Sequence, residues 1–312
     1  MGVSTSPPIA AAQPAVRRMS AWTNSPLVLR RLALLSVIVN VGIVVTGGAV
    51  RLTNSGLGCP TWPRCDGSSL VPRSKLGSNG VIEFTNRTLT FVVAAALALT
   101  FLVAWRQRRQ VGLAALALAG IPAQAVLGGI VVLTDLNPWL VAAHFLLSAA
   151  IIAATLLLWW RLSEHPAVPV PLPGRFLVRA LVGVSALVLV AGTLVTGAGP
   201  HAGDLKHGQV RRIGLPIAGL AQLHADIVMV LIGLTVGLVA LAWVLHAPPL
   251  QRAAAVLLGV ELAQGVLGYT QYFLHVPALL VGLHMLGACL VWIAALRLLL
   301  MTSVAEPVSP AG

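Results

Sequence analysis

Charged residues, and acidic residues above all, are scarce in this sequence. Asp and Glu number 8 against 20 Lys and Arg, and charged residues make up only 9% of the chain. Soluble domains carry about 25% charged residues, so the composition excludes an ordinary soluble protein. Hydrophobic residues reach 58% and the mean hydropathy is +0.92, which indicates a chain embedded in a lipid bilayer. Although the net charge is +12, no basic soluble domain is present to bind nucleic acid.

The hydrophobic residues gather in runs of membrane-spanning length, since a spanning helix needs roughly 20 apolar residues. The runs lie near 32–50, 84–105, 111–133, 139–160, 176–197, 217–245, 253–274 and 278–301. We therefore predict an all-α polytopic membrane protein with eight transmembrane helices.

The basic residues indicate how these helices are oriented. One side contains Arg17, Arg18, Arg30, Arg31, Arg106, Arg108, Arg109, Arg161, Arg175, Arg179, Arg252 and Arg297. Cytoplasmic loops carry an excess of Lys and Arg, so we expect this side and both termini in the cytoplasm, at a bacterial plasma membrane. The long loops 51–82 and 198–216 are expected outside. The first 26 residues contain arginines but no acidic residue, which leaves a mitochondrial transit peptide as the alternative.

Two segments 140 residues apart repeat each other in register. Gln124 to Gly128, followed by His144, matches Gln264 to Gly268, followed by His284. We therefore predict a duplication, with two four-helix bundles related by a pseudo-twofold axis along the membrane normal. The expected divisions are a cytoplasmic tail (1–31), an N-terminal half (32–160), a Pro-rich linker (161–175), a C-terminal half (176–301) and a second cytoplasmic tail (302–312).

Three histidines lie inside these helices at one expected depth. His144, His224 and His284 are placed roughly 7–11 Å below the outer boundary, and Asn86 takes the position equivalent to His224 in the first half. Inward imidazoles on neighbouring helices can bind both faces of a heme iron. A single such histidine more often only hydrogen-bonds a neighbouring helix, but the shared depth and the repeat favour ligation. His165 and His246 are expected to be loop or interface residues. His201, His207 and His275 are expected to be solvated rather than ligating.

Cysteine is also rare, with three in the chain. Cys59 and Cys65 lie in the first outer loop, where an oxidising compartment favours a disulfide. Zinc would need further thiol or imidazole ligands beside them, and none is adjacent. Cys289 lies within the last apolar run, where we predict a small packing residue.

Three segments carry a resemblance to a known family: Arg51 to Cys65 (RLTNSGLGCPTWPRC), Glu83 to Arg87 (EFTNR) and Thr196 to Asp204 (TGAGPHAGD). With the intrahelical histidines, they resemble heme A synthase over nearly the whole chain. The resemblance implies an oxidoreductase that converts heme o to heme a for terminal oxidase assembly. A ring methyl would become a formyl group through two hydroxylations and loss of water. The resemblance also implies heme b held by His224 and His284, a substrate-heme site in the N-terminal half, and a catalytic role for Glu83.

The sequence departs from this family at Asn86, where many members have histidine. His144 is then the only strong axial ligand expected for the substrate heme. Glu83 and Arg87 are four residues apart and share a helix face, so a simple ion pair between them is the competing interpretation of Glu83.

The chemistry of a heme adds two expectations. Its propionates are anions, and Arg51, Arg87, Arg211 and Arg212 near the outer surface are predicted to pair with them. The glycine pairs Gly47–Gly48 and Gly128–Gly129 are predicted to let a flat ring approach the helix backbone.

Two other classes of function compete with the synthase. A quinol-linked diheme cytochrome b would need membrane histidines, but not Glu83 beside a ligand-poor pocket. A transporter built from repeats would explain the duplication, but not imidazoles at one depth without acidic partners. The synthase interpretation implies the lipid bilayer, heme o synthase and terminal oxidase assembly as partners. It is compatible with a homo-oligomer and leaves the electron donor open.

Overall fold

The structure is a computed structural model that describes residues 25–165, 167–204 and 210–302. Its helices are α2 (Pro26–Leu52), α3 (Gly77–Gln107), α4 (Val111–Leu133), α5 (Pro138–Arg161), α6 (Leu172–Ala198), α7 (Ile217–Val244), α8 (Pro248–Phe273) and α9 (Ala278–Thr302), with a 3-10 turn η1 (Ser74–Leu76). All eight α-helices in this part of the chain are long and apolar enough to cross a membrane. The prediction of an all-α, multi-pass membrane protein is confirmed. The predictions made for Arg17, Arg18, His207 and residues 303–312 of the second tail lie outside the described residues.

Several helices begin before the apolar run that predicted them. α2 begins at Pro26 rather than near 32, and α6 begins at Leu172 rather than near 176. In both cases proline occupies the first turn, where its missing N–H costs no hydrogen bond and its fixed φ suits the helix. The expected first tail and linker are therefore shorter than predicted. α3 begins at Gly77, seven residues before the predicted start near 84, so Glu83 lies within the helix rather than at its start.

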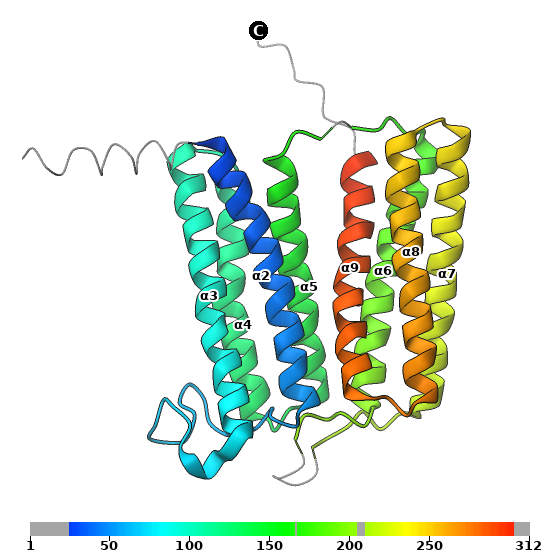
Figure 1. The fold of residues 1–312 in the computed structure, drawn as a ribbon. Helices are drawn as coiled ribbons and strands as arrows, with labels where there is room; N and C mark the ends of the chain where they lie inside the picture. The colour runs from blue at the N-terminus through cyan, green and yellow to red at the C-terminus, as the bar shows by residue number, and fades with distance from the viewer. Residues whose placement is uncertain (1–24, 166, 205–209, 303–312) are drawn as a thin grey trace, which may run out of the picture.

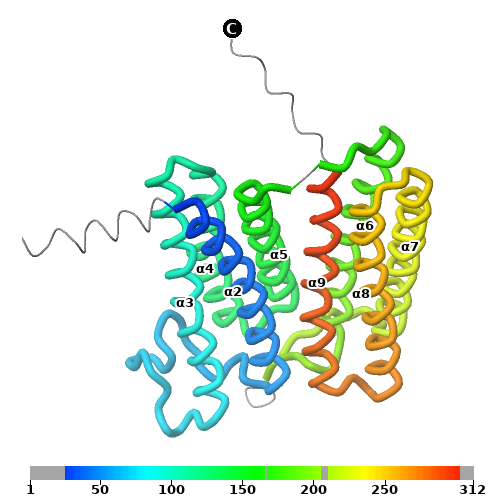
Figure 2. Tube along the Cα trace, turned by 45° about the horizontal axis from the view of Figure 1, so that its top comes forward, coloured from blue at the N-terminus to red at the C-terminus, as the bar shows by residue number. Residues whose placement is uncertain are grey.

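The helices form two groups of four, as Figure 1 shows, with α2–α5 on one side and α6–α9 on the other. Within each group consecutive helices pack together, and the first helix also packs against the last. Between the groups α2 contacts α9, α5 contacts α6, and α5 contacts α9. Exchanging the two groups leaves this set of contacts unchanged, as a twofold relation requires. The contacts agree with the predicted pseudo-twofold axis, which stays a prediction. The tube in Figure 2, turned by 45°, shows the same separation of the groups.

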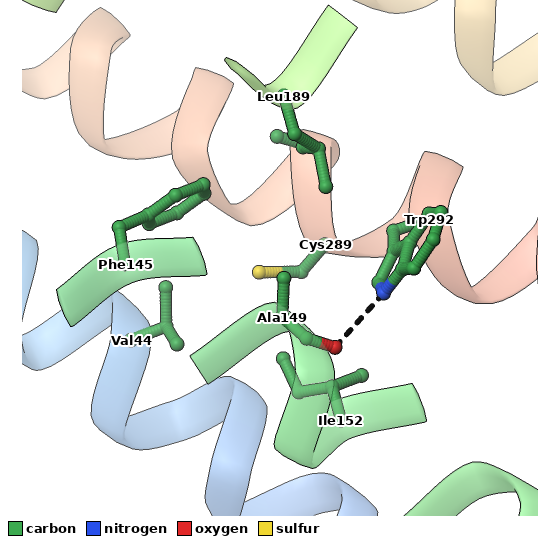
Figure 3. A pocket seen from close by; sticks show the side chains of 8 residues that line it. Val44, Phe145, Ala149, Ile152, Leu189, Cys289 and Trp292 are labelled. Carbon is green, nitrogen blue, oxygen red and sulfur yellow. Dashed lines mark hydrogen bonds between the residues drawn. The ribbon is translucent and has the colours of Figure 1, made fainter. Parts of the chain in front are cut away.

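Apolar side chains fill the surface between the two groups. Figure 3 shows Phe145 and Ile152 of α5 facing Cys289 and Trp292 of α9 around a small apolar cavity. The indole Nε1 of Trp292 donates a hydrogen bond of 3.0 Å to the backbone carbonyl of Ala149. Cys289 is a free, buried thiol among these side chains, so its predicted role as a packing residue is confirmed. Phe145 follows His144 directly in the chain, so this packing helps fix the helix that carries that histidine.

Candidate functional site

The three intrahelical histidines lie near the same end of their helices. His144 lies six residues after the start of α5, His224 seven after the start of α7, and His284 six after the start of α9. A helix rises 1.5 Å per residue, so each lies roughly 9–11 Å inside its helix. The starts of α5, α7 and α9 share the end of the bundle that bears the two long loops (Figure 1).

The two histidines of the second group face each other. The ring centres of His224 and His284 are 6.4 Å apart, and their planes are inclined by 64°. An imidazole nitrogen bonds a metal at about 2 Å, and the ring centre lies roughly 1 Å farther away. Two imidazoles on opposite faces of one metal ion therefore have ring centres about 6 Å apart. The observed spacing fits a pair of axial ligands.

The nitrogens of these imidazoles are largely unused by the protein. The Nδ1 atoms of His144, His224 and His284 are buried and lack a hydrogen-bond partner among the described residues. The Val188 backbone carbonyl of α6 approaches the His224 ring, but without well-formed hydrogen-bond geometry. Buried polar atoms normally have partners. The orphaned Nδ1 atoms therefore disfavour the interpretation that these histidines only hydrogen-bond a neighbouring helix.

Each of the four polar positions packs against a glycine of the preceding helix. The pairs are Gly47 with Asn86, Gly128 with His144, Gly192 with His224, and Gly268 with His284. A Cβ atom added to the three glycines that face histidine would lie 3.1–3.5 Å from the imidazole Cε1 atoms. At Gly128 and Gly192 the ring would have to shift by a few tenths of an ångström to admit a Cβ atom, whereas at Gly268 the Cβ would make an ordinary contact. Longer side chains at these positions would compete with the rings for space. The fourfold recurrence of this pairing supports a common origin of the four positions.

A repeated hydrogen bond also fixes two of the histidine-bearing segments. Gln124 Nε2 donates to the backbone carbonyl of His144 at 3.0 Å, and Gln264 Nε2 donates to that of His284 at 2.8 Å. Both glutamines belong to the 140-residue repeat. Their side chains hold neighbouring helices in register and so orient the two imidazoles. The sequence showed the recurrence of these glutamines, but not which group they bind.

The second glycine of each predicted pair has another partner. The space beside Gly48 is filled by the Met285 side chain of α9, and the space beside Gly129 by the indole of Trp62 in the first outer loop. The prediction that both glycines admit a flat ring is wrong for these two positions, because adjacent helix positions face directions about 100° apart. Gly47 faces Asn86 and Gly128 faces His144, and the approach of a flat ring to these two glycines stays a prediction.

The first outer loop is attached to α3 by a buried ion pair. Glu83 is 5% exposed, and one carboxylate oxygen accepts hydrogen bonds from the Arg87 guanidinium at 2.5 and 3.1 Å. Its other oxygen accepts a bond of 2.7 Å from the Cys59 backbone N–H. Arg87 also donates to the carbonyls of Cys59 and Thr61 at 2.8 and 3.0 Å. The structure therefore shows the ion pair between Glu83 and Arg87 that the helix spacing suggested. It also shows that both residues bind the backbone of the first outer loop.

The loop contains the predicted disulfide between Cys59 and Cys65, which is confirmed. Trp62 lies between these cysteines in the sequence and packs on Gly129 of α4, next to the glycine that faces His144. The disulfide segment thus lies against the first group near His144, with Glu83 and Arg87 holding its base.

We expect reduction of this disulfide to weaken the loop. A loop of this length gains about 2–3 kcal/mol from the cross-link, so Cys59→Ala with Cys65→Ala should lower the unfolding temperature by several degrees. Maleimide labelling of denatured, unreduced protein from its native membrane should modify one thiol, and reduction should expose all three. Cys289→Ala is the matched control, since it removes the free thiol and leaves the cross-link. Three reactive thiols before reduction would contradict the disulfide.

The arginines near the outer end mostly contact backbone carbonyls. Arg51 donates to the His201 carbonyl at 2.5 Å and to the Thr196 carbonyl at 2.9 Å. Arg212 donates to the carbonyls of Gly199 and Pro200 at 2.8 and 3.0 Å. Arg51 thereby links the end of α2 in the first group to the end of α6 and the loop after it in the second group.

One outer arginine and one outer histidine complete this surface. Arg211 is exposed to solvent and is the best placed of the four predicted arginines to meet an anion. The propionate role of these arginines stays a prediction. His201, expected to be solvated, has its Nε2 2.8 Å from the Val276 carbonyl, and so links the loop after α6 to the loop before α9.

A buried carboxyl group in the second group was missed by sequence reasoning. Glu261 of α8 is 2% exposed, accepts a hydrogen bond of 2.9 Å from the Thr235 hydroxyl of α7, and leaves Oε2 without a partner among the described residues. A glutamate within a membrane-spanning helix is the signal that marks it, because such residues are costly and commonly functional.

Fold and site together define a multi-pass membrane protein with inward-facing imidazoles near one membrane surface. The profile of the cytochrome oxidase assembly protein family, COX15-CtaA, matches residues 30–296. The chain belongs to this family. It is similar to proteins named heme A synthase from Lysinibacillus sphaericus strain C3-41 (38% identity over 122 residues, 37% of this chain and 39% of the relative) and Alkalihalophilus pseudofirmus (31% over 137 residues, 41% and 46%). A third relative of that name, from Geobacillus thermodenitrificans, is 32% identical over 132 residues, 40% of this chain and 41% of the relative. The match thus spans about two fifths of the length of these curated relatives.

Proposed function

We propose that this protein is a heme A synthase, an oxidoreductase that converts heme o to heme a. The observation that carries the proposal is the facing pair His224 and His284, whose ring centres lie 6.4 Å apart. The family membership and the names of the similar proteins support it. The proposed role is the supply of heme a for terminal oxidase assembly, with heme o synthase as the source of substrate.

The second group is proposed to hold heme b through His224 and His284. The spacing of the rings fits two axial bonds. Such a heme would supply electron transfer to the reaction. The contribution of this chain is to fix both rings, through the glycine contacts and through the Gln264 hydrogen bond.

The first group is proposed to be the reaction site, with heme o as substrate and heme a as product. His144 is the only histidine that the described part of this group presents inside its helices, because Asn86 stands where the second group has His224. The amide Oδ1 of Asn86 is buried without a partner. A substrate held by one strong ligand exchanges more readily than one held by two, which suits a site whose product must leave after each turnover.

Glu83 is proposed as the proton-carrying group of this reaction site. It lies one helical turn before Asn86, so the two side chains share a helix face. Methyl hydroxylation and loss of water from a gem-diol both move protons, for which a carboxyl group is suited. Arg87 and the Cys59 N–H hold the carboxylate in place. Trp62, packed on Gly129, covers the surface beside His144 and would limit the access of water.

The arginine distribution supports placing both termini in the cytoplasm and the disulfide loop outside, in a bacterial plasma membrane. Nine of the arginines predicted to be cytoplasmic lie at or near the end of the bundle opposite the disulfide loop, among the described residues of α2–α9: Arg30, Arg31, Arg106, Arg108, Arg109, Arg161, Arg175, Arg252 and Arg297. This asymmetry agrees with the positive-inside rule.

Pigment analysis tests the function directly. We expect protein produced together with a heme o source to contain heme b plus a mixture of heme o and heme a, identified by mass spectrometry of the extracted hemes. Heme b alone would instead indicate the diheme electron-transfer cytochrome. Absence of any heme would contradict both interpretations. Protein produced without the heme o source is the control, and it should retain heme b.

A further inference from the structure

A basic cavity opens at the end of the bundle opposite the disulfide loop. Its volume is about 250 Å³, and it is lined by Leu27, Arg30, Arg31 and Leu34 of α2 and by Trp159 of α5. The start of α2 and the end of α5 meet at this end (Figure 1). The cavity is therefore separated from the histidines by much of the length of the helices.

The lining of this cavity combines two arginines with apolar side chains. Leu27 precedes the adjacent Arg30 and Arg31 by three and four positions, and Leu34 follows them by four and three, so these residues lie along one helix face. Arg30 and Arg31 are in the second turn of α2 and are exposed. Leu34 is 39% exposed, and the same face continues into the span with Ile38, which is 58% exposed. A ligand with a charged head and an apolar chain would meet both parts of this face.

Among the described residues, no carboxylate forms an ion pair with Arg30 or Arg31. The ion pairs of Asp66 and Glu83 lie at the opposite end of the bundle. A third cation, Arg297, also lies near: burial, and then the positive charges of Arg297 and Arg30, lower the pKa of His165 in the linker and so favour its neutral form. His165 stacks on Trp160, with ring centres 3.9 Å apart. An anion between Arg30 and Arg31 would offset the repulsion among these cations.

We propose that this cavity binds the phosphate of an anionic phospholipid, with an acyl chain lying along Leu34 and Ile38. Arginine is well suited to phosphate, because its planar guanidinium donates paired hydrogen bonds. Basic pockets between helices at the cytoplasmic side bind anionic headgroups, and tryptophan prefers the level of the headgroups. The exposed apolar face favours a lipid over free phosphate, which would use the arginines alone.

Lipid-dependent stabilisation of the purified, full-length protein tests this proposal. In detergent, phosphatidylglycerol should raise the unfolding temperature, while phosphatidylcholine and inorganic phosphate should not. Arg30→Gln with Arg31→Gln should weaken the apparent affinity for phosphatidylglycerol on the order of tenfold. The matched control is Arg106→Gln with Arg109→Gln, which removes the same charge from exposed positions in the last turn of α3 and in the loop after it and should leave that affinity unchanged.

Two further measurements make the result decisive. Trp159→Leu removes a cavity wall without changing charge and should also weaken the lipid effect. Native mass spectrometry should show one tightly retained anionic lipid on the wild type and on the control, but not on the Arg30/Arg31 variant. If phosphatidylglycerol stabilised all variants equally, the proposal would be overturned, because the lipid would then act through the general positive charge of the surface. A response to inorganic phosphate equal to that of the lipid would also overturn it, and would indicate a free-phosphate site.

Discussion

Replacing either His224 or His284 with alanine is expected to abolish the low-spin heme b signal of the purified protein. The rings face each other at the separation that two axial bonds require, so neither can be lost without leaving one face of the iron unligated. Optical and electron paramagnetic resonance spectra measure the signal, and pyridine hemochrome analysis measures heme b per protein. Because each ring packs on a glycine, Gly268→Leu should have a similar effect by displacing His284.

The control for this experiment is His246→Ala. His246 is an exposed histidine just after α7, and its Nδ1 lies 3.1 Å from the Val244 carbonyl, so its removal should leave the spectrum intact. A low-spin signal that survives in both the His224 and the His284 variants would show that these residues do not bind the heme. The proposed assignment of the second group would then fall.

Replacing Glu83 with alanine is expected to stop the production of heme a while heme b remains bound in the second group. Loss of a proton-transferring group lowers rates by about two to four orders of magnitude. His144→Ala should give the same separation, because it removes the only strong ligand proposed for the substrate. The ratio of heme a to heme o after expression measures the reaction, and the low-spin spectrum measures the retained heme b.

A structural role of Glu83 must be separated from a chemical one, because its carboxylate also binds the disulfide loop. Glu83→Gln keeps an acceptor for the Cys59 N–H but cannot carry a proton as a carboxyl group does. If Glu83 transfers protons, this variant makes almost no heme a although its disulfide and unfolding temperature stay near those of the wild type. The exposed linker variant Glu164→Gln is the control and should be fully active. Normal heme a production by Glu83→Gln would reduce Glu83 to a support of the loop.

The transmembrane architecture was predictable from the sequence because it follows from local composition. Backbone polar groups within a bilayer must bond within their own helix, so each apolar run of sufficient length had to become a helix. The runs at 111–133 and 139–160 are accordingly close to α4 and α5. Helix starts were less predictable, as at Pro26 and Gly77, because caps and first turns lie in polar sequence where hydropathy carries no signal.

The histidines and the cysteine pair were also visible in the sequence. The repeat placed His144 and His284 in register, and helical geometry alone gave the common depth. Cys59 and Cys65 are close in sequence and lie in a loop expected on the oxidising outer side of the membrane. Their disulfide could therefore be predicted without the structure. These features depend on spacing within one helix or one loop, and therefore needed no knowledge of which segments meet.

Only the tertiary structure decided which residues face one another across segments. The 6.4 Å spacing of His224 and His284, the binding of Glu83 to the Cys59 N–H, and the use of Gly48 by Met285 join positions from 24 to 237 residues apart in the chain. Such contacts depend on how each helix is rotated about its axis. In a bilayer apolar residues cover all faces of a helix, so hydropathy does not reveal that rotation. The sequence by itself therefore determined the spans and the candidate ligands, while the packing of small and large side chains determined how they form a site.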